Sequence, residues 1–272
     1  MATLSLDARS EKWIKEGRGS GTGKDYRPWL TVRDLPSAGR SHRVLGLRTQ
    51  RTHHLLSDLE LAAFFLFDWN PNVTDIREQY PLRLDETLKL ATEAGIRHPG
   101  VRGQPQVMST DFLLDTKDQS RPKIAIQVKA SSDLARPRTV EKLELERRYW
   151  EGKDIPWYLI TEKEIPKAVT GNIAWLYPAQ ATRAELEGLI ATAPLYGKYF
   201  SQHPTSPISQ AAMALDQAYA LAPGESLQKI RSLMAVRYFL FDMTRPWSAL
   251  TVGELHVSPD AHSLRGRYAA NQ

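Results

Sequence analysis

Four polar residues have the types that metal-dependent hydrolysis of a phosphodiester needs: Glu60, Asp111, Gln127 and Lys129. In such a reaction the attacking water, the phosphorus and the leaving oxygen lie in line, and cations offset the growing negative charge. Mg²⁺ is a hard ion that prefers oxygen ligands, which carboxylate and amide side chains supply. The four residues therefore predict a divalent-metal site beside one fixed cationic side chain.

Each side chain has an expected role in that site. Asp111 is the expected bridge to Mg²⁺, with the side-chain oxygen of Gln127 or the backbone carbonyl of Val128 as a second ligand. Glu60 is expected to reach the metal directly or through water. Lys129 either orients the attacking water and stabilises charge on the phosphate, or acts as a base if its pKa is lowered. The sequence leaves both roles of Lys129 open.

A β-hairpin is expected to bring three of these residues together. Asp111 lies in segment 108–116 and Gln127 in segment 123–130, both rich in apolar and β-branched residues and joined by a polar loop. A turn centred near Gln119 places Asp111 opposite Gln127 on neighbouring strands. Strand alternation then predicts one core face and one site face. The core face carries Ile124, Ile126 and Val128, and the site face carries Ala125, Gln127 and Lys129.

The same residues also have purely structural interpretations. Asp111 and Lys129 on adjacent strands can form a cross-strand ion pair with no chemical role. The segment from Ser57 to Glu60 is a capping box, so Glu60 can serve only to begin the apolar helix expected at residues 57–69. Residue types and spacing alone leave these interpretations open.

Further motifs follow one another from about residue 12 to residue 177. They are the glycine-rich segments 15–19 and 23–26, then 53–61, Asp75-Ile-Arg-Glu-Gln79, Met108-Ser-Thr-Asp-Phe112, Gln127-Val-Lys129, 141–150 and Ile155-Pro-Trp157. In this order they resemble the TnsA endonuclease family, the 5′-end-cutting subunits of heteromeric cut-and-paste transposases. The likeness fades in the C-terminal third.

The resemblance implies a restriction-endonuclease-like α/β fold, with a mixed sheet flanked by helices. It carries the family's catalytic Glu, Asp, Gln and Lys onto Glu60, Asp111, Gln127 and Lys129. It also implies Mg²⁺-dependent cleavage of double-stranded DNA at transposon ends, with Mn²⁺ as a substitute metal. Two protein partners follow in the same way: a DDE transposase that cuts and joins the 3′ ends, and a regulatory AAA+ ATPase.

The chain departs from the wider PD-(D/E)XK nuclease pattern at one position. That pattern prefers an acid where this sequence has Gln127, and the TnsA variant has glutamine there. With two acids in place of three, the metal-free site carries one negative charge less. We therefore expect a weaker resting affinity for metal, which suits an enzyme that cuts only in an assembled complex.

Composition excludes several other chemistries. The chain has no cysteine, which rules out disulfides, thiolate zinc sites and a cysteine nucleophile. The seven histidines form no zinc-binding motif, so oxygen ligands are expected for any metal. No apolar run approaches ~18 residues and no signal peptide opens the chain. We therefore expect a protein of the bacterial cytosol and nucleoid with no membrane partner.

Positive charge is concentrated near the N-terminus. The net charge is +5, while residues 1–56 carry eleven Lys or Arg against five Asp or Glu, which is +6 and leaves −1 for the rest. Residues 1–40 also hold aromatic residues and glycines, and they predict a basic arm with a short helix around residues 8–16. Clustered cations attract the DNA backbone, although a solvated arm is the alternative.

Two domains are expected: residues 1–165, an endonuclease domain with the basic arm, and residues 166–272, a smaller, mainly helical, winged-helix-like interaction domain. In the second, three helices precede a hairpin of strands 235–243 and 249–252. The elements expected in the first are hairpin 44–56, helix 57–69, strand 73–80, helix 85–94, the hairpin that carries Asp111 and Gln127, helix 139–151 and strand 155–161.

Charged pairs on the expected helix 139–151 are interpreted as solvated stabilisers. Glu144 with Arg148, and Lys142 with Glu146, have the spacing of helical ion pairs. A metal or DNA role for Glu144 or Glu146 is the alternative.

Three functions remain compatible with the sequence. The first is the transposon-end endonuclease that the resemblance implies. The second is a repair nuclease or junction resolvase of the same fold. The third is a non-catalytic DNA-binding assembly subunit, in which Asp111 and Lys129 only pair with each other.

Overall fold

The computed structural model describes residues 7–34, 40–101, 103–180 and 183–261. The chain divides into two compact units, Met1–Ile165 and Pro166–Gln272, and each is described by itself. The basic arm predicted for residues 1–40 lies partly outside the described residues, at 1–6 and 35–39. No helix in the described part of the chain combines the length and apolar character that crossing a membrane requires.

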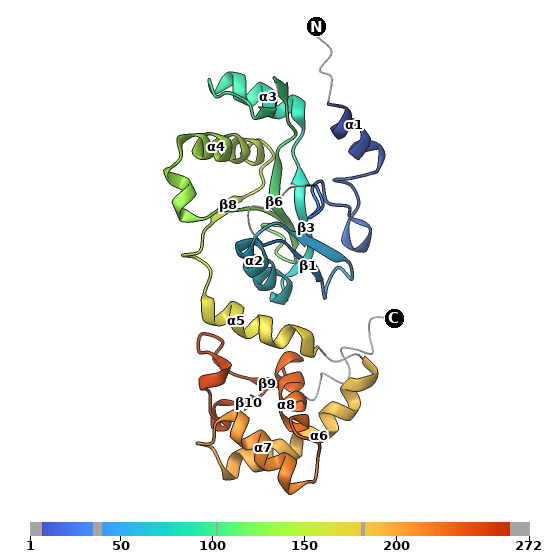
Figure 1. Ribbon diagram of the computed structural model, residues 1–272, viewed down its shortest axis with the longest axis vertical. Coiled ribbons are helices and arrows are strands. Elements are labelled where there is room, and N and C mark those ends of the chain that lie inside the picture. Colours follow the sequence, from blue (N-terminus) through green and yellow to red (C-terminus); the bar gives the residue numbers. More distant parts are fainter. Residues whose placement is uncertain (1–6, 35–39, 102, 181–182, 262–272) are drawn as a thin grey trace. The chain divides into compact units, whose positions relative to one another are not determined.

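The first unit is built on a mixed sheet of four strands: β3 (Val73–Pro81), β6 (Ser109–Thr116), β7 (Lys123–Val128) and β8 (Trp157–Ile160). The strand order is β3-β6-β7-β8 (Figure 1). β3 is antiparallel to β6, β6 is antiparallel to β7, and β7 is parallel to β8. This sheet and the helices around it confirm the predicted α/β class.

The hairpin of β6 and β7 has the predicted register. Phe112 pairs with Ile126 and Leu114 with Ile124, so the same register extended by one residue sets Asp111 against Gln127. This register follows from the position of the turn, which fixes every later pair along the two strands.

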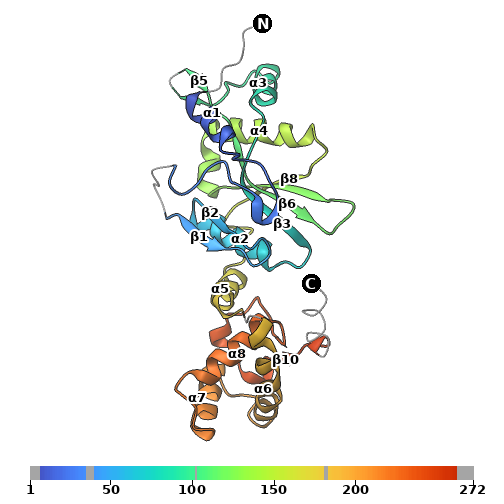
Figure 2. The ribbon, with the colours of Figure 1, turned by 90° about the vertical axis from the view of Figure 1, so that its right-hand side faces the viewer.

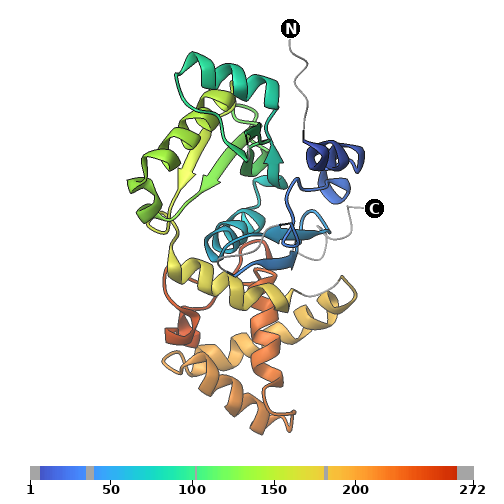
Figure 3. The ribbon, with the colours of Figure 1, turned by 45° about the horizontal axis from the view of Figure 1, so that its top comes forward.

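Helices cover both faces of this sheet, so the prediction of one core face and one site face is wrong. On one face Leu113 and Ala125 pack with Tyr149 and Trp150. On the other face the ring of Phe112 lies 5.3 Å from the ring of Phe67. The helices responsible are α4 (Pro137–Glu151) on the first face and α2 (Asp58–Trp69) on the second, and α3 (Leu84–Glu93) lies beside α4 (Figure 3).

The N-terminal segment packs along β3, an edge strand of the sheet (Figure 2). Gly23 N–H donates to the Asp75 carboxylate, and Trp29 N–H donates to the Gln79 carbonyl at 3.2 Å. Gly21 has a φ of +89°, and a Cβ there would lie 2.5 Å from the Asp25 carbonyl oxygen, so only glycine fits. This segment contains α1 (Ala8–Lys15) and the 3₁₀ turn η1 (Gly23–Asp25), and the hairpin of β1 (His42–Leu45) and β2 (Thr52–Leu55) follows it.

The second unit is mainly helical, as predicted. Its helices are α5 (Lys167–Leu176), α6 (Arg183–Gln202), α7 (Ile208–Ala218) and α8 (Glu225–Ala235), with the 3₁₀ turn η3 (Tyr177–Ala179) after α5. Asp216 in α7 holds the start of α8, because its carboxylate accepts hydrogen bonds from the backbone N–H groups of Gly224 and Ser226. An acidic group suits that position at the positive end of the helix dipole.

The predicted C-terminal hairpin of strands 235–243 and 249–252 is wrong. Ala235 belongs to α8, Ala249 ends one 3₁₀ turn, and Val252 begins another. The pairing that forms is between β9 (Phe239–Leu240) and β10 (His256–Val257), with η4 (Trp247–Ala249) and η5 (Val252–Glu254) between them. The likeness of this unit to a winged helix stays a prediction.

Contacts distant in sequence hold the loop that was predicted as a hairpin turn. The Asn172 side chain donates to the carbonyls of Met243 and Arg245 and accepts from the N–H of Trp247. The ring of Trp247 also stacks on Trp175 at 3.8 Å. These partners lie in α5, about seventy residues earlier, so local alternation of apolar residues carries no trace of them.

Candidate active site

Asp111 and Gln127 meet at the end of the β6–β7 hairpin that lies away from its turn. The Asp111 N–H donates to Oε1 of Gln127 at 3.0 Å, and Oδ2 of Asp111 accepts from the Val128 N–H at 2.9 Å. Both side chains are buried, although each is polar. Side chains thus replace backbone hydrogen bonds at this point and hold the carboxylate and the amide side by side.

Lys129 follows directly after β7 and faces the same carboxylate. Its Nζ lies 3.6 Å from Oδ2 of Asp111, and a third of its side chain is exposed. Burial lowers the pKa of Lys129, but the negative charges of Asp111, Glu146 and Glu60 outweigh burial, so the pKa lies above its ordinary value. The ammonium is therefore charged at neutral pH. The ion pair that the structural interpretation predicts is present.

Glu60 caps α2 and also faces the site. Its N–H donates to the Ser57 hydroxyl at 3.1 Å, which confirms the predicted cap. Its carboxylate accepts from the Ser57 hydroxyl and, at 2.9 Å, from the Leu56 N–H. Burial raises the pKa of Glu60 to about 7, and repulsion from Asp111 adds to that rise. A helix cap does not require a second carboxylate such as Asp111 nearby, so capping alone does not explain the position of Glu60.

Gln79, a residue without an assigned role in the sequence prediction, connects Glu60 with Asp111. Its Nε2 donates to Oδ1 of Asp111 at 3.2 Å and to Oε2 of Glu60 at 3.4 Å, and its Oε1 accepts from the Ser109 hydroxyl. Its backbone has a φ of +50° in the middle of β3, a left-handed value that is costly for a residue with a side chain. The β3–β6 register, interpolated between Glu78–Phe112 and Tyr80–Thr110, sets Gln79 opposite Asp111, and the sequence alone does not indicate this pairing.

Glu146 also lies near the site, which corrects the predicted surface pair with Lys142. Its Oε1 accepts from the Thr110 hydroxyl at 2.8 Å and from the Trp157 indole N–H at 3.0 Å. Burial raises its pKa to about 8, and Asp111 contributes to that rise. Glu146 lies one helical turn from Leu143 and from Trp150, on the buried face of α4, and this spacing was the available signal. The predicted pair of Glu144 with Arg148 is confirmed at 2.6 Å.

The donor atoms gathered here suit a hard divalent cation. Two carboxylates that share one donor nitrogen, that of Gln79, lie close enough to share a cation. The Gln127 oxygen accepts one hydrogen bond and keeps a second lone pair. Within the described residues, no group of three or more His, Cys, Asp or Glu is placed to bind a metal. A metal site here therefore depends on amide or carbonyl oxygens beside the two acids, which Mg²⁺ accepts.

Comparison with known proteins agrees along nearly the whole chain. The family model "TnsA-like endonuclease N terminal" matches residues 70–162, and "TnsA endonuclease C terminal" matches residues 164–243. The transposon Tn7 transposition protein TnsA of Escherichia coli is 46% identical over 258 residues, which are 95% of this chain and 94% of that protein. The chain belongs to the TnsA endonuclease family. The resemblance inferred from the motifs is thus confirmed.

Membership of the TnsA endonuclease family decides the class of function. The protein is a DNA endonuclease of cut-and-paste transposition, and endonucleases of this family depend on a metal. The first family match contains Asp111, Gln127 and Lys129, and Glu60 precedes it. The roles of these four side chains stay predictions, which the geometry of the site makes specific.

Proposed function

We propose that this protein is the Mg²⁺-dependent subunit that cleaves the 5′ ends of a transposon, with Mn²⁺ as a substitute metal. It acts on double-stranded DNA in the bacterial cytoplasm, together with a DDE transposase that processes the 3′ ends and an AAA+ ATPase regulator. The observation that carries the proposal is the joint position of Asp111, Gln127, Lys129 and Glu60 at one end of the sheet in a chain of the TnsA family.

The metal ligands in this proposal are Asp111, Glu60 and either Oε1 of Gln127 or the carbonyl of Val128. A bound divalent ion supplies Lewis-acid stabilisation of charge on the phosphate. The chain's own hydrogen bonds prepare the ligands, because the Val128 N–H fixes the Asp111 carboxylate and the Leu56 N–H fixes that of Glu60. Groups held in place in advance cost little reorganisation when the reaction occurs.

Lys129 acts as an electrostatic group in this proposal. A general base must lose its proton near the working pH, whereas the pKa of Lys129 is raised by the surrounding carboxylates. Its ammonium is placed to donate to an oxygen of the scissile phosphate and to offset the charge that grows there. The raised pKa belongs to the metal-free site, in which Lys129 is present as an ammonium.

The test is strand cleavage by the full-length protein with Asp111→Asn. The asparagine keeps the shape and removes the charge, so cleavage should fall on the order of a thousandfold, or ~4 kcal/mol of barrier. Asp118→Asn, in the exposed turn of the same hairpin, is the control and should cut normally. Circular dichroism checks that both variants fold. Normal Mg²⁺-dependent cutting by the folded Asp111 variant would remove this site from the mechanism.

The choice of substrate tests the transposon assignment separately. The protein, mixed with the transposase encoded beside it, is given a duplex that joins a transposon end to flanking DNA. Cleavage at the 5′ end is the expected result. Preferential cleavage of a four-way junction or of damaged DNA would instead indicate a repair or resolvase enzyme of the same fold. Absence of metal-dependent cleavage in every mixture would indicate an assembly subunit without catalysis.

A further inference from the structure

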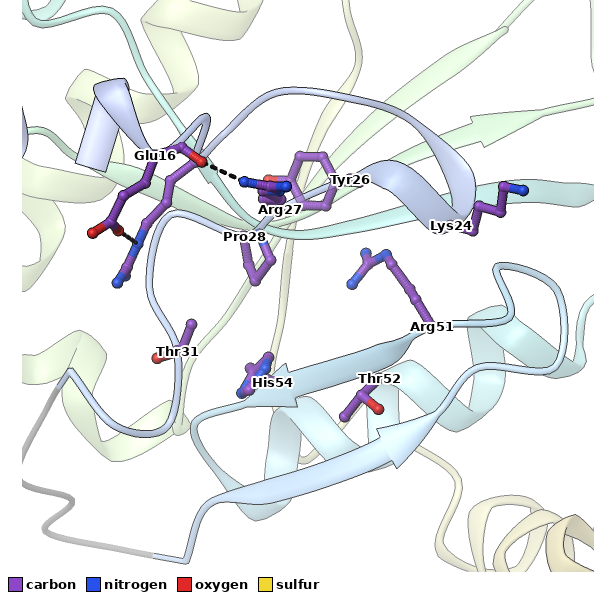
Figure 4. A pocket seen from close by; sticks show the side chains of 10 residues that line it. Glu16, Lys24, Tyr26, Arg27, Pro28, Thr31, Arg51, Thr52 and His54 are labelled. Carbon is purple, nitrogen blue, oxygen red and sulfur yellow. Dashed lines mark hydrogen bonds and ion pairs between the residues drawn. The ribbon is translucent and has the colours of Figure 1, made fainter. Parts of the chain in front are cut away.

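A basic pocket lies between the N-terminal segment 16–31 and strand β2, away from the four catalytic candidates. Its volume is about 450 Å³, and Figure 4 shows the arm on one side and β2 on the other. The charged side chains that line it are four cations and one acid: Arg18, Lys24, Arg27, Arg51 and Glu16. Such a lining favours an anionic ligand.

Two of these cations are available to a ligand. Lys24 and Arg27 are exposed, and neither forms an ion pair with any residue that the structure describes. Arg51, in contrast, is fixed: its guanidinium donates to both carboxylate oxygens of the buried Glu78, at 2.8 and 2.5 Å. Arg27 donates through one nitrogen to the Glu16 carbonyl at 2.7 Å (Figure 4). The pocket therefore combines a fixed Arg51 with two exposed cations, Lys24 and Arg27, that no carboxylate among the described residues neutralises.

His54 in β2 also lines the pocket. Its Nδ1 is buried and has no hydrogen-bond partner, which is unusual for a polar atom removed from water. Burial lowers the pKa of His54, and Arg43, Arg51 and Arg33 lower it further against the opposing charge of Glu78. The imidazole is therefore a neutral polar group beside the cations of the pocket.

The pocket is close to the candidate active site along the chain. His54 lies in β2, and Leu56, two residues later, donates its N–H to the Glu60 carboxylate. Two residues of extended chain span ~7 Å. On one DNA strand, successive phosphates are ~3.4 Å apart along the helix axis. The short length of chain between His54 and Leu56 lets neighbouring phosphates of one strand lie beside the pocket and beside the site.

We propose that this pocket binds a backbone phosphate of the DNA strand that is cut, one or two nucleotides from the scissile phosphate. The inference rests on the proposed function, since it takes the site of Glu60 and Asp111 as the place of cleavage. Lys24 and Arg27 contact the phosphate from the arm, while Arg51, which directly precedes β2, and His54 in β2 face it from the other side. The arm thereby acts as a clamp that sets the register of the strand.

The first experiment measures DNA affinity without any divalent metal. Fluorescence anisotropy follows a labelled transposon-end duplex between 50 and 200 mM NaCl, about the range over which phosphate contacts change affinity most. The double variant Lys24→Gln/Arg27→Gln should bind more weakly, and the slope of log K against log salt should become less negative by about 0.9. Lys89→Gln removes one charge from an exposed lysine of α3, so it is the control for loss of a distant surface charge and should retain the wild-type slope.

The second experiment locates the phosphate. A single uncharged methylphosphonate replaces each phosphate in turn around the cleavage position. The wild-type protein should lose affinity when the replacement lies one or two nucleotides from that position. The double variant and His54→Gln should be insensitive to the same replacement, because the contact is already absent. Equal sensitivity of wild type and variants at every position would overturn the proposal.

Two further outcomes are informative. If the pocket variants change the binding of inorganic phosphate but not of DNA, the pocket is an anion site unrelated to the cut strand, and the proposal is wrong. If they bind DNA as wild type does while Asp111→Asn abolishes cleavage, the phosphate pocket fails and the proposed function stands. If wild type never cleaves, the proposed function fails whatever the binding slopes are.

Discussion

Gln79 donates a hydrogen bond to Asp111, with 3.2 Å between Nε2 and Oδ1, from a backbone in the left-handed region. The same nitrogen lies 3.4 Å from Glu60, so one neutral amide holds two carboxylates together. Strained backbone at such a place is typical of functional sites, because the surrounding structure has to maintain it. In the proposed function, this amide positions the two carboxylates beside each other.

Two substitutions of Gln79 distinguish the contribution of its side chain to stability from the contribution of its backbone conformation. Gln79→Ala should lower the free energy of unfolding by about 2 kcal/mol, because two carboxylates lose their donor. Gln79→Gly loses the same donor but accepts a positive φ, so it should be about 1 kcal/mol more stable than Gln79→Ala. Urea denaturation at pH 7 measures both. Equal stability of the two variants would show that the backbone at residue 79 stores no strain.

Gln50 provides a matched control for that comparison. It also has a positive φ, +53°, but it is exposed in the turn between β1 and β2. The free energy of unfolding of Gln50→Gly should exceed that of Gln50→Ala by a similar amount, about 1 kcal/mol. Neither variant should change the rate of cleavage. Both Gln79 variants should cleave more slowly than wild type. Wild-type cleavage by the folded Gln79→Ala protein would leave Gln79 without a positioning role.

Lys129→Met tests whether the ammonium acts on the substrate. The variant should bind Mn²⁺ at least as tightly as wild type, since a positive charge repels the metal ion, while cleavage falls about a hundredfold or more. Lys123→Met is the control: Lys123 begins the strand that Lys129 follows, and its Nζ pairs with Asp115 at 2.7 Å at the turn end of the hairpin. Calorimetric titration and a cleavage assay give the two readouts. Loss of metal binding with activity would make Lys129 an organiser of the site instead.

Glu146 should make the stability of the protein depend on pH in an unusual direction. Its pKa is about 8 in the folded state, above the ordinary value of 4.5, so the folded state binds more protons between those pH values. Stability contributed by the protonated group is therefore complete below pH 4.5 and is lost as the pH rises through 8. Glu146→Gln stays neutral and keeps an oxygen to accept from Thr110 and Trp157.

The stability of Glu146→Gln relative to wild type should consequently increase with pH, by up to roughly 1.4 kcal/mol per pH unit within that window. Urea denaturation at several pH values between 5 and 9 measures it. Glu144→Gln is the control on the same helix, because Arg147 and Arg148 hold the pKa of Glu144 at about 2, outside the range tested. A constant difference between wild type and Glu146→Gln would mean that Glu146 is ionised throughout.

The sequence predicted those parts of the site that local rules determine. The turn near Gln119 fixed the pairing of Asp111 with Gln127, and the Ser57 cap fixed the start of α2. The sequence did not predict the position of Gln79 in the site, because that position depends on the pairing of β3 with β6, two strands joined by a long connection. A residue's neighbours across such a connection are set by the fold and leave no periodic signal nearby.

Glu146 and the C-terminal hairpin show two other limits. A glutamate near the edge of a helix's apolar stripe can form an ion pair on the surface or point into the protein. Glu146 points inward because Thr110 and Trp157 donate hydrogen bonds to its carboxylate there. The alternation of residues 235–252 indicated strands, but Asn172 and Trp175 hold that segment as a loop. Long-range contacts thus overrode the local pattern in the C-terminal segment, whereas the burial of Glu146 was indicated by its spacing from Leu143 and Trp150.

The two compact units predict that residues 1–166 fold without the rest of the chain. The sheet of β3, β6, β7 and β8 and its covering helices all lie before Pro166, and the Glu164 carboxylate accepts from the backbone N–H and the hydroxyl of Thr161 after the last strand. The truncated protein should therefore unfold cooperatively and keep the wild-type affinity for Mn²⁺. Thermal denaturation followed by circular dichroism, and calorimetric titration, measure these properties.

Loss of the second unit should affect assembly and not the chemistry of the site. If Pro166–Gln272 docks the transposase or the ATPase, residues 1–166 should fail to co-purify with them and should lose coordinated 5′-end cutting on transposon DNA. The matched control is the full-length Asp111→Asn protein, which should co-purify normally but not cut. Because the two proteins fail for opposite reasons, mixing them in one reaction should not restore cutting. Retained partner binding by residues 1–166 would place the docking surface on the endonuclease unit.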